Sequence, residues 1–340
     1  MSIDAVIAWV DGNDPAHREC LQEYLQTLGG SPPSAAHPTR FNDAGELDYC
    51  VTSIFRFAPW FRKLHIVTNG QTPGLLRAVE RSVFAERIHL VDHAEIFRGY
   101  EHYLPTFNAR TISGALWRIE GLTDQFVYFN DDFALLQPVR ETDFFDGECM
   151  IVRGEWRKQS HFSWSKRLAR RVSRSGAGSH AAQELGAQLA GFERKYYYNY
   201  HNPYPMRRST LDRFFSQYPE RLDSHLSHRL RSAQQFRTEC LASHLEIAQG
   251  TALLDNRLRT AQLKPHQQAA WRVRARMALA DRDPNVAFAC VQSIELASRA
   301  MQARIFAWLD RRVGRLDALI AASCVEDEQD LRPTRSQVQD

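Results

Sequence analysis

Three adjacent polar residues, Asn130, Asp131 and Asp132, follow a hydrophobic stretch of the chain. Neighbouring carboxylates at the end of a buried strand offer hard oxygen ligands, which suit Mg²⁺ or Mn²⁺ ions that also hold substrate phosphates. Asn and Asp are also frequent in solvated turns. The pattern by itself therefore leaves a metal site and an ordinary turn equally open.

A second acidic group lies near the start of the chain, where Asp11 and Asp14 flank Gly12. In open α/β sheets the loop after the first strand commonly contacts a nucleotide. The loop has no GxGxxG sequence and no Walker lysine, so it gives no support to a dinucleotide site or a P-loop. The alternative is a turn in which Asp14 caps the following helix.

Three further side chains could take part in catalysis. Glu46 follows Asp43 by three residues before an apolar helical run, which favours a capping box and leaves a catalytic carboxylate open. His201 lies in an aromatic, proline-rich stretch. With an ordinary pKa of about 6.5 it could accept a proton from a sugar hydroxyl, although packed histidines are common. Arg237 could bind phosphate through its guanidinium group, although many arginines are simply surface residues.

The elements that would position these residues alternate along the first 150 residues. Short apolar runs, each followed by a polar turn, predict buried strands at residues 3–10, 64–68, 88–91 and 125–129. Helical patterns lie between them, from about residue 43 and at about 107–119. This alternation predicts a mostly parallel sheet with ligands bound at the carboxyl ends of the strands, where the polar clusters fall.

After residue 150 the composition changes. Residues 153–174 are rich in Lys and Arg, and residues 196–205 are aromatic and proline-rich, which predicts a rigid loop. Residues 286–291 could form one more strand, and residues 295–313 have the pattern of an amphipathic helix. We therefore expect an α/β core at 1–150, a mostly helical part at 151–325 and a disordered tail at 326–340.

Composition limits the class of protein. With 43 Lys and Arg against 40 Asp and Glu, the net charge of +3 gives no general field for nucleic acid. Six scattered cysteines without metal-finger spacing suit reduced thiols. No signal peptide or run of 18 apolar residues is visible. We expect a cytoplasmic location, with peripheral contact at the inner face of the cytoplasmic membrane left open.

Taken together, several segments resemble the Stealth family of sugar-phosphate transferases. Residues 3–15 resemble its first signature, and residues 40–73, continued through 104–108 to 128–132, resemble its second and longest. Residues 201–209 with 236–237 are similar to the third region, and residues 290–309 to the fourth. The match covers most of the chain in the family's order.

The resemblance implies a nucleotide-sugar-transferase-like (GT-A-like) core, a Mg²⁺ or Mn²⁺ ion and a nucleotide-diphosphate sugar, with UDP as the expected nucleotide. It also implies transfer of a sugar-1-phosphate to a hydroxyl of an oligo- or polysaccharide, with release of a nucleoside monophosphate, in capsule or exopolysaccharide synthesis. Carried over by position, the active-site groups would be Glu46, Asp131, Asp132, His201 and Arg237, with Asp11, Gly12 and Asp14 at the nucleotide.

Within that scheme Asp131 and Asp132 would hold the metal, and Arg237 would offset the remaining negative charge. His201 would be the base for the acceptor hydroxyl, with Glu46 as the second candidate.

The chain departs from the family pattern at three places, namely Asp48-Tyr49-Cys50, Ser113 and Glu295. Two alternatives therefore stay open. One is a metal-dependent glycosyltransferase that releases a nucleoside diphosphate, and the other is a weakly active member that binds polyanions or acts as a scaffold. The basic residues 153–174 and these departures suggest the second alternative. In a phosphotransferase the same basic residues could form a lid over the anionic polymer, or simply a solvated helix face. Contact with the capsule assembly machinery is a further open expectation.

Overall fold

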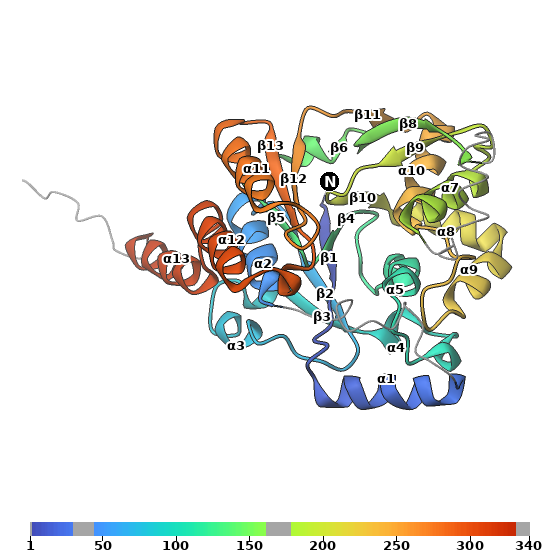
Figure 1. The fold of residues 1–340 in the computed structure, drawn as a ribbon, viewed down its shortest axis with the longest axis horizontal. Coiled ribbons are helices and arrows are strands. Elements are labelled where there is room, and N and C mark those ends of the chain that lie inside the picture. The colour runs from blue at the N-terminus through green and yellow to red at the C-terminus, as the bar shows by residue number, and fades with distance from the viewer. Residues whose placement is uncertain (1, 30–43, 161–177, 331–340) are drawn as a thin grey trace, which may run out of the picture.

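A five-stranded sheet lies at the centre of the computed structural model, which describes residues 2–29, 44–160 and 178–330. Its strand order is β10-β4-β1-β2-β3 (Figure 1). The strands β1 (Asp4–Ala8), β2 (Leu64–Thr68), β3 (Ile88–Asp92) and β4 (Gln125–Asn130) run parallel, and β10 (Tyr204–Arg207) runs antiparallel to β4. The expected mostly parallel α/β core is confirmed.

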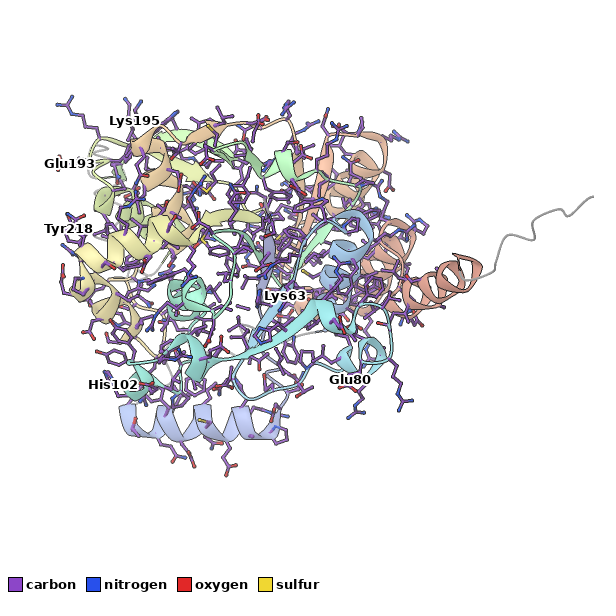
Figure 2. All side chains as sticks on the ribbon, turned by 180° about the vertical axis from the view of Figure 1, so that it is seen from behind. Lys63, Glu80, His102, Glu193, Lys195 and Tyr218 are labelled. Carbon is purple, nitrogen blue, oxygen red and sulfur yellow. The ribbon has the colours of Figure 1, made fainter. Side chains whose placement is uncertain are left out.

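The inner strands are apolar along most of their length because helices cover both faces of the sheet. Nearly every residue of β1, β2 and β4 is buried. Figure 1 shows α2 (Glu46–Phe57), α12 (Arg299–Arg312) and α13 (Leu316–Asp330) on one side of the sheet and α5 (Ala109–Ala115), α8 (Arg208–Gln217) and α10 (Thr238–Gln249) on the other. Charged side chains such as Glu80, Glu193 and Lys195 point outward from the surface of the molecule (Figure 2).

The remaining described helices lie around this core. They are α1 (Pro15–Leu28), α3 (Leu76–Val79), α4 (His93–Ile96), α7 (Ser179–Leu189), α9 (Pro219–Leu226) and α11 (Ala270–Arg282).

Smaller sheets extend the core on the side of β4. The strands β12 (Arg259–Leu263), β13 (Val286–Val291) and β5 (Phe133–Leu135) form one sheet, and β11 (Ala252–Leu254), β7 (Cys149–Val152) and β6 (Phe145–Asp146) form another. The strands β8 (Gly154–Lys158) and β9 (Lys195–Asn199) pair antiparallel. The possible strand at 286–291 is thus confirmed, and the helical second half also contributes β10 to the central sheet. The division of the chain near residue 150 stays a prediction.

Two local expectations are wrong. Residues 196–205 do not form one loop, because tyrosine favours strands: 195–199 form β9 and 204–207 form β10. The helix α2 begins at Glu46 with Gly45 as its N-cap, so Glu46 does not hold the third position that a capping box needs. The expected disordered tail at 326–340 stays a prediction: α13 continues to Asp330, and residues 331–340 lie outside the described residues.

Two expectations fall partly outside the described residues. Asp43 lies outside them, as do residues 161–177, which contain most of the basic segment 153–174. The structure does describe the first residues of this basic segment. Arg153 is buried, and residues 154–158 form β8.

A buried acidic residue ties the start of β1 to its neighbours. The carboxylate of Asp4 accepts hydrogen bonds from Arg62 Nε (2.9 Å) and Nη2 (2.6 Å) and from the Thr123 backbone N–H (3.0 Å), and it lies 3.2 Å from His65 Nε2. Burial by itself would raise the pKa of Asp4, but the bonds from His65, Arg62 and Thr123 hold it well below its ordinary value. The ionised form therefore stabilises the fold.

We expect Asp4→Asn to lower the free energy of unfolding by about 2–3 kcal/mol at pH 7, since it removes charge-assisted hydrogen bonds. A lowered carboxyl pKa stabilises the fold above the unfolded-state pKa and ceases to do so as pH falls. The difference in the free energy of unfolding between wild type and variant should therefore become smaller below about pH 4. Urea unfolding at several pH values measures this. Glu120→Gln, which breaks an exposed ion pair with Arg98, should cost less than about 1 kcal/mol. Equal losses for both variants would contradict the assignment.

Candidate active site

The predicted acidic clusters emerge at one edge of the central sheet. Ala8 of β1 pairs with Asn130 of β4 and with Val67 of β2. Because the strands are parallel, the segments that follow these residues leave the sheet at the same edge. Asp11 and Asp131 therefore belong to the same carboxyl-terminal rim.

Asp132, His201 and Cys290 come together at this rim although they are far apart in the sequence. One potential ligand atom from each lies within 4.8 Å of the other two. The thiol of Cys290 donates to Asp132 Oδ2 at 3.4 Å. The other oxygen, Oδ1, is buried and has no hydrogen-bond partner among the described residues. An unsatisfied buried carboxylate oxygen is costly, and a divalent cation would satisfy it.

The electrostatics of this cluster agree with a cation site. Burial raises the pKa of Asp132 to about 7. Burial, together with the charge of Asp132, raises the pKa of the Cys290 thiol well above its ordinary value. A bound cation would favour the ionised carboxylate. A carboxylate and an imidazole suit Mn²⁺, whereas a thiolate ligand would favour a softer ion such as Zn²⁺.

Asp131 is not one of these three residues. Its Oδ1 accepts a hydrogen bond from the backbone N–H of Asp132 at 3.0 Å. The sequence predicted Asp131 and Asp132 as a ligand pair, whereas the structure groups Asp132 with His201 and Cys290.

His201 is fixed on both sides of its ring. Nδ1 lies 2.7 Å from the hydroxyl of Tyr204, Nε2 lies 3.3 Å from Asn130 Nδ2, and Phe133 packs against the ring. Burial, assisted by the positive charge of Arg237, lowers the pKa of His201 well below 6.5. The expectation of an ordinary pKa is therefore wrong. At neutral pH the ring is an uncharged imidazole, which can accept a proton or bind a metal.

Arg237 reaches His201 through Tyr204. Its Nη2 donates to the Tyr204 hydroxyl at 2.9 Å, its Nη1 donates to Ser179 Oγ at 3.2 Å, and it forms an ion pair with Glu239. Burial would lower the pKa of Arg237, but Glu239 and Tyr204 hold it above its ordinary value. The cation is therefore permanent, and Tyr204 links it to the imidazole.

Sequence analysis gave no individual role to Tyr204, Glu239 or Cys290. The signal for Tyr204 was its place in the same short segment as His201, and Cys290 lay in an expected strand. Glu239 had no such signal.

Glu46 lies at the start of α2 and is buried, and its Oε2 accepts a hydrogen bond from the Ala44 backbone N–H at 2.6 Å. One turn later, Cys50 Sγ lies 3.7 Å from the backbone oxygen of Asn130. Residues four apart share a helix face, so the beginning of α2 is directed toward the rim that carries Asp131 and Asp132.

The loop after β1 is held by one glutamine. Asp14 caps α1 through a bond from the Ala16 N–H (2.8 Å), as the alternative interpretation expected. Gln71 Nε2 donates to Asp14 Oδ2 (3.0 Å) and to the Asp11 carbonyl (2.9 Å), and Gln71 Oε1 accepts from the Asp11 N–H (2.9 Å). The bonds from Gln71 and Ala16 lower the pKa of Asp14. The loop with Gly12 is thus ordered, and its contact with a nucleotide stays a prediction.

Comparison with known proteins identifies the family. Residues 1–29 match the family model of Stealth protein conserved region 1, and residues 40–152 match that of conserved region 2. A receptor polysaccharide phosphotransferase of Streptococcus gordonii is 30% identical over 275 residues, which cover 75% of this chain and 80% of that protein. The chain belongs to the Stealth family.

Other Stealth relatives are matched over a smaller share of their length. An exopolysaccharide phosphotransferase of Streptomyces coelicolor is 34% identical over 220 residues, or 64% of this chain and 35% of that protein. A capsular polysaccharide phosphotransferase of Streptococcus pneumoniae is 39% identical over 143 residues, or 42% of this chain and 41% of that protein. The chain thus matches less than half of the length of each of these two relatives.

Two solved glycosyltransferase structures are similar to this Stealth chain. The galactosyltransferase LgtC, in complex with donor and acceptor sugar analogues, has 14% identity and a TM-score of 0.38 over 85% of this chain and 86% of that one. Mouse xyloside xylosyltransferase 1 has 12% identity and a TM-score of 0.40 over 85% and 97%.

The two Stealth regions contain only part of the site. Asp11, Gly12 and Asp14 lie in region 1, and Glu46, Asp131 and Asp132 lie in region 2, which confirms the first two sequence resemblances. His201, Arg237 and Cys290 lie outside both matched segments, and the fold brings His201 and Cys290 to Asp132. The resemblance of residues 201–209 and 290–309 to the third and fourth regions stays a prediction.

Proposed function

We propose that this Stealth protein transfers a sugar-1-phosphate from a nucleotide-diphosphate sugar to a hydroxyl group of an acceptor saccharide. The product would be a phosphodiester-linked capsular or exopolysaccharide, and the leaving group a nucleoside monophosphate. Relatives named as capsular, exopolysaccharide and receptor polysaccharide phosphotransferases support this assignment. The observation that carries it is the proximity, within 4.8 Å, of Asp132, with its unsatisfied buried oxygen, and the neutral imidazole of His201 at the carboxyl-terminal rim.

Asp132 would hold a Mg²⁺ or Mn²⁺ ion, with Asp131 beside it. Such an ion, when bound, neutralises charge on the donor diphosphate. The acceptor oxygen forms a bond to the phosphorus that carries the sugar, and the bond from that phosphorus to the bridging oxygen breaks. The bridging oxygen leaves with the nucleoside monophosphate, and the proton of the acceptor hydroxyl passes to a base of the protein.

His201 is the base that we favour, through Nε2. In that role the neutral ring carries its proton on Nδ1. The Nδ1–H group then donates a hydrogen bond to the Tyr204 hydroxyl, which lies 2.7 Å away. Arg237 fixes the same hydroxyl from the other side. Arg237 and Tyr204 therefore hold the imidazole in the tautomer and orientation that proton transfer requires.

Two further parts of the proposal concern the nucleotide and the location of the protein in the cell. The ordered loop of Asp11, Gly12 and Asp14 lies at the rim where a nucleotide would bind, with UDP as the proposed nucleotide. Five of the six cysteines, namely Cys20, Cys50, Cys149, Cys240 and Cys290, are free thiols, which supports a reducing, cytoplasmic location. Among the described residues, no helix has the length and apolar character that crossing a membrane requires.

Product analysis tests the reaction type. We expect incubation of the protein with UDP-linked hexoses, Mn²⁺ and an oligosaccharide acceptor to release UMP and to leave phosphorus in the glycan. Anion-exchange chromatography and ³¹P NMR measure both products. Release of UDP with a phosphorus-free glycan would establish the glycosyltransferase alternative, and no turnover with a broad donor panel would favour the scaffold alternative. Asp132→Asn serves as the control for contaminating activity.

A further inference from the structure

A cavity of about 310 Å³ adjoins His201. Its walls come from the end of β9, the segment before β12 and β12 itself, and they include Arg153, Tyr198, Tyr200, Asn202, Arg259 and Gln262. The volume lies at the lower end of the range of about 300–1,000 Å³ that small-molecule sites occupy. Apart from His201, these residues have no part in the mechanism above.

Arg153 is a buried cation that the protein satisfies only in part. Its side chain is 4% exposed, and Nη2 donates to the Asp143 carbonyl at 2.6 Å. Nε and Nη1 are buried without a hydrogen-bond partner, and the guanidinium lies over the rings of Phe144 and Phe288, 5.8 and 5.3 Å from their centroids. Burial lowers its pKa to about 10, which still leaves a full positive charge at neutral pH. The two rings offset part of the cost of burying this charge, and a bound anion would offset more of it.

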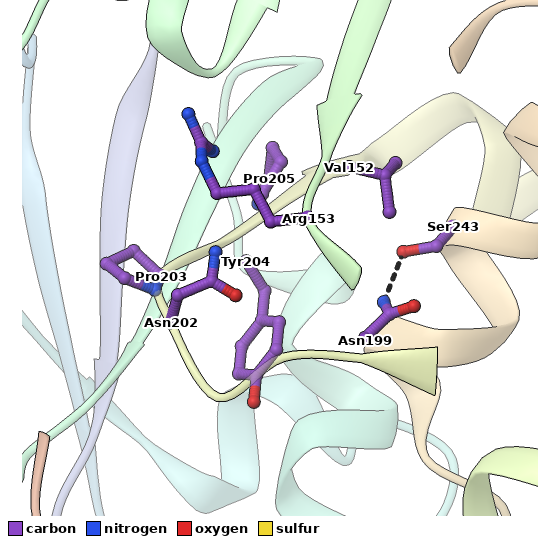
Figure 3. Close-up of a pocket in the computed structure, with 8 residues that line it drawn as sticks. All are labelled: Val152, Arg153, Asn199, Asn202, Pro203, Tyr204, Pro205 and Ser243. Carbon is purple, nitrogen blue, oxygen red and sulfur yellow. Dashed lines mark hydrogen bonds between the residues drawn. The ribbon is translucent and has the colours of Figure 1, made fainter. Parts of the chain in front are cut away.

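Asn202 adds a polar group beside this cation. It is buried, and its side-chain amide makes no hydrogen bond with the described residues. Arg153 and Asn202 both line the cavity and also a smaller one next to it, which Figure 3 shows. In that smaller cavity Asn199 donates to Ser243 Oγ at 2.6 Å and closes the opposite wall. The Asn202 amide thus remains available to a ligand of the larger cavity, and Arg153 is part of the same wall.

The rest of the wall suits a sugar ring. Tyr200 is 38% exposed and provides an aromatic surface, and Gln262 and Arg259 supply polar groups. Gln262 pairs in register with Cys290 on β13, and Cys290 belongs to the cluster of Asp132 and His201. The cavity therefore borders the proposed reaction centre, and His201 lies in both.

We propose that this cavity binds the acceptor, and that the acceptor is a saccharide already carrying a phosphate group, which Arg153 binds while Tyr200 packs against the sugar ring. This inference rests on the proposed function. Each round of sugar-1-phosphate transfer leaves a phosphodiester at the new end of the chain. An anion site next to the proposed base would thus select the product of the previous round over a neutral glycan.

Direct binding tests the site without turnover. The probes are α-D-glucose 1-phosphate, glucose and inorganic phosphate. They are added to the full chain in EDTA, so that a metal-dependent donor site does not bind them. Saturation-transfer NMR titrations give the affinities. We expect glucose 1-phosphate to bind at least ~10-fold more tightly than glucose or phosphate, because it uses both parts of the cavity.

Two variants separate the parts of the ligand. Arg153→Gln should weaken glucose 1-phosphate ~10–100-fold and leave glucose unchanged, since it removes a charge-assisted contact. Tyr200→Ala should weaken both sugars by the same factor. Arg257→Gln is the matched control, because this exposed arginine pairs with Asp255 and does not line the cavity. If Arg153→Gln does not fold, Gln262→Glu replaces it, because a carboxylate on the wall should repel the phosphate and spare glucose.

The proposal is overturned if glucose and glucose 1-phosphate bind equally, or if neither Arg153→Gln nor Gln262→Glu changes their ratio. Displacement of glucose 1-phosphate by UDP in EDTA would assign the cavity to the donor and would also overturn it. These outcomes do not depend on which nucleotide the enzyme releases, so failure here and failure of the proposed function can be distinguished.

Discussion

Asp132→Asn is expected to lower turnover by at least ~10²-fold, because stabilisation by a divalent cation is worth several kcal/mol in reactions of this class. The variant keeps the shape and the acceptor oxygen that faces Cys290, but it loses the charge that holds a cation. Steady-state release of nucleotide measures the loss. Full activity of the wild type in excess chelator would contradict the metal assignment.

The same variant should melt at a higher temperature than the wild type in chelator at pH 8. Burial raises the pKa of Asp132 to about 7, so the folded state binds its proton more tightly than the unfolded state does. A raised carboxyl pKa costs stability as pH rises from about 4 through 7, and an amide avoids this cost. The difference in melting temperature should vanish near pH 4. A lower melting temperature of Asp132→Asn than of the wild type at pH 8 would mean that the carboxylate stabilises the fold rather than binding a cation.

Two matched variants define the ligand set. The sequence pattern predicts the same loss for Asp131→Asn, whereas the grouping of Asp132 with His201 and Cys290 predicts a smaller one. Cys290→Ser should retain most activity with Mg²⁺ or Mn²⁺, because a thiol is a poor ligand for hard cations. A loss as large as that of Asp132→Asn would make the thiolate a ligand of a softer metal.

The strands of the central sheet and their polar ends could be predicted from sequence because both signals are local. An apolar run such as residues 125–129 can only be buried, and the Asn-Asp-Asp that follows it has to leave the sheet at the carboxyl end. Because β1 and β4 pair in parallel, Asp11 is placed at the same edge of the sheet as Asp132, and no other pairing has to be known for this prediction. The fold class and half of the site follow from these two facts.

The other half of the site depends on pairings between distant strands. His201 reaches Asp132 because β10 adds antiparallel to β4, and Cys290 reaches it because β13 pairs with β5. Neither pairing leaves a local pattern. The lowered pKa of His201 comes from the same packing, since it is caused by burial. Residue types thus indicated which side chains are candidates for catalysis, but not which of them would be buried together.

Removing the base should lower turnover by about 10²–10⁴-fold, and the two candidates, His201 and Glu46, differ in what else they change. His201→Ala should lose that factor and should also lose the acidic limb of the pH–rate profile. Because burial lowers the pKa of His201, the limb of the wild type should lie below pH 6.5. Glu46→Gln can still accept the Ala44 N–H, so it should melt like the wild type and slow turnover strongly only if the carboxylate is catalytic.

The position of His201 beside Asp132 requires one more measurement, because the same nitrogen cannot both bind a cation and take up the acceptor proton. If His201 is the base, His201→Ala should leave the Mn²⁺ concentration at half-maximal residual activity unchanged, and Tyr204→Phe should lower turnover while keeping the acidic limb. A rise of ~10-fold or more in that Mn²⁺ concentration would make His201 a ligand instead. If the limb survives in His201→Ala and disappears in Glu46→Gln, then Glu46 is the base.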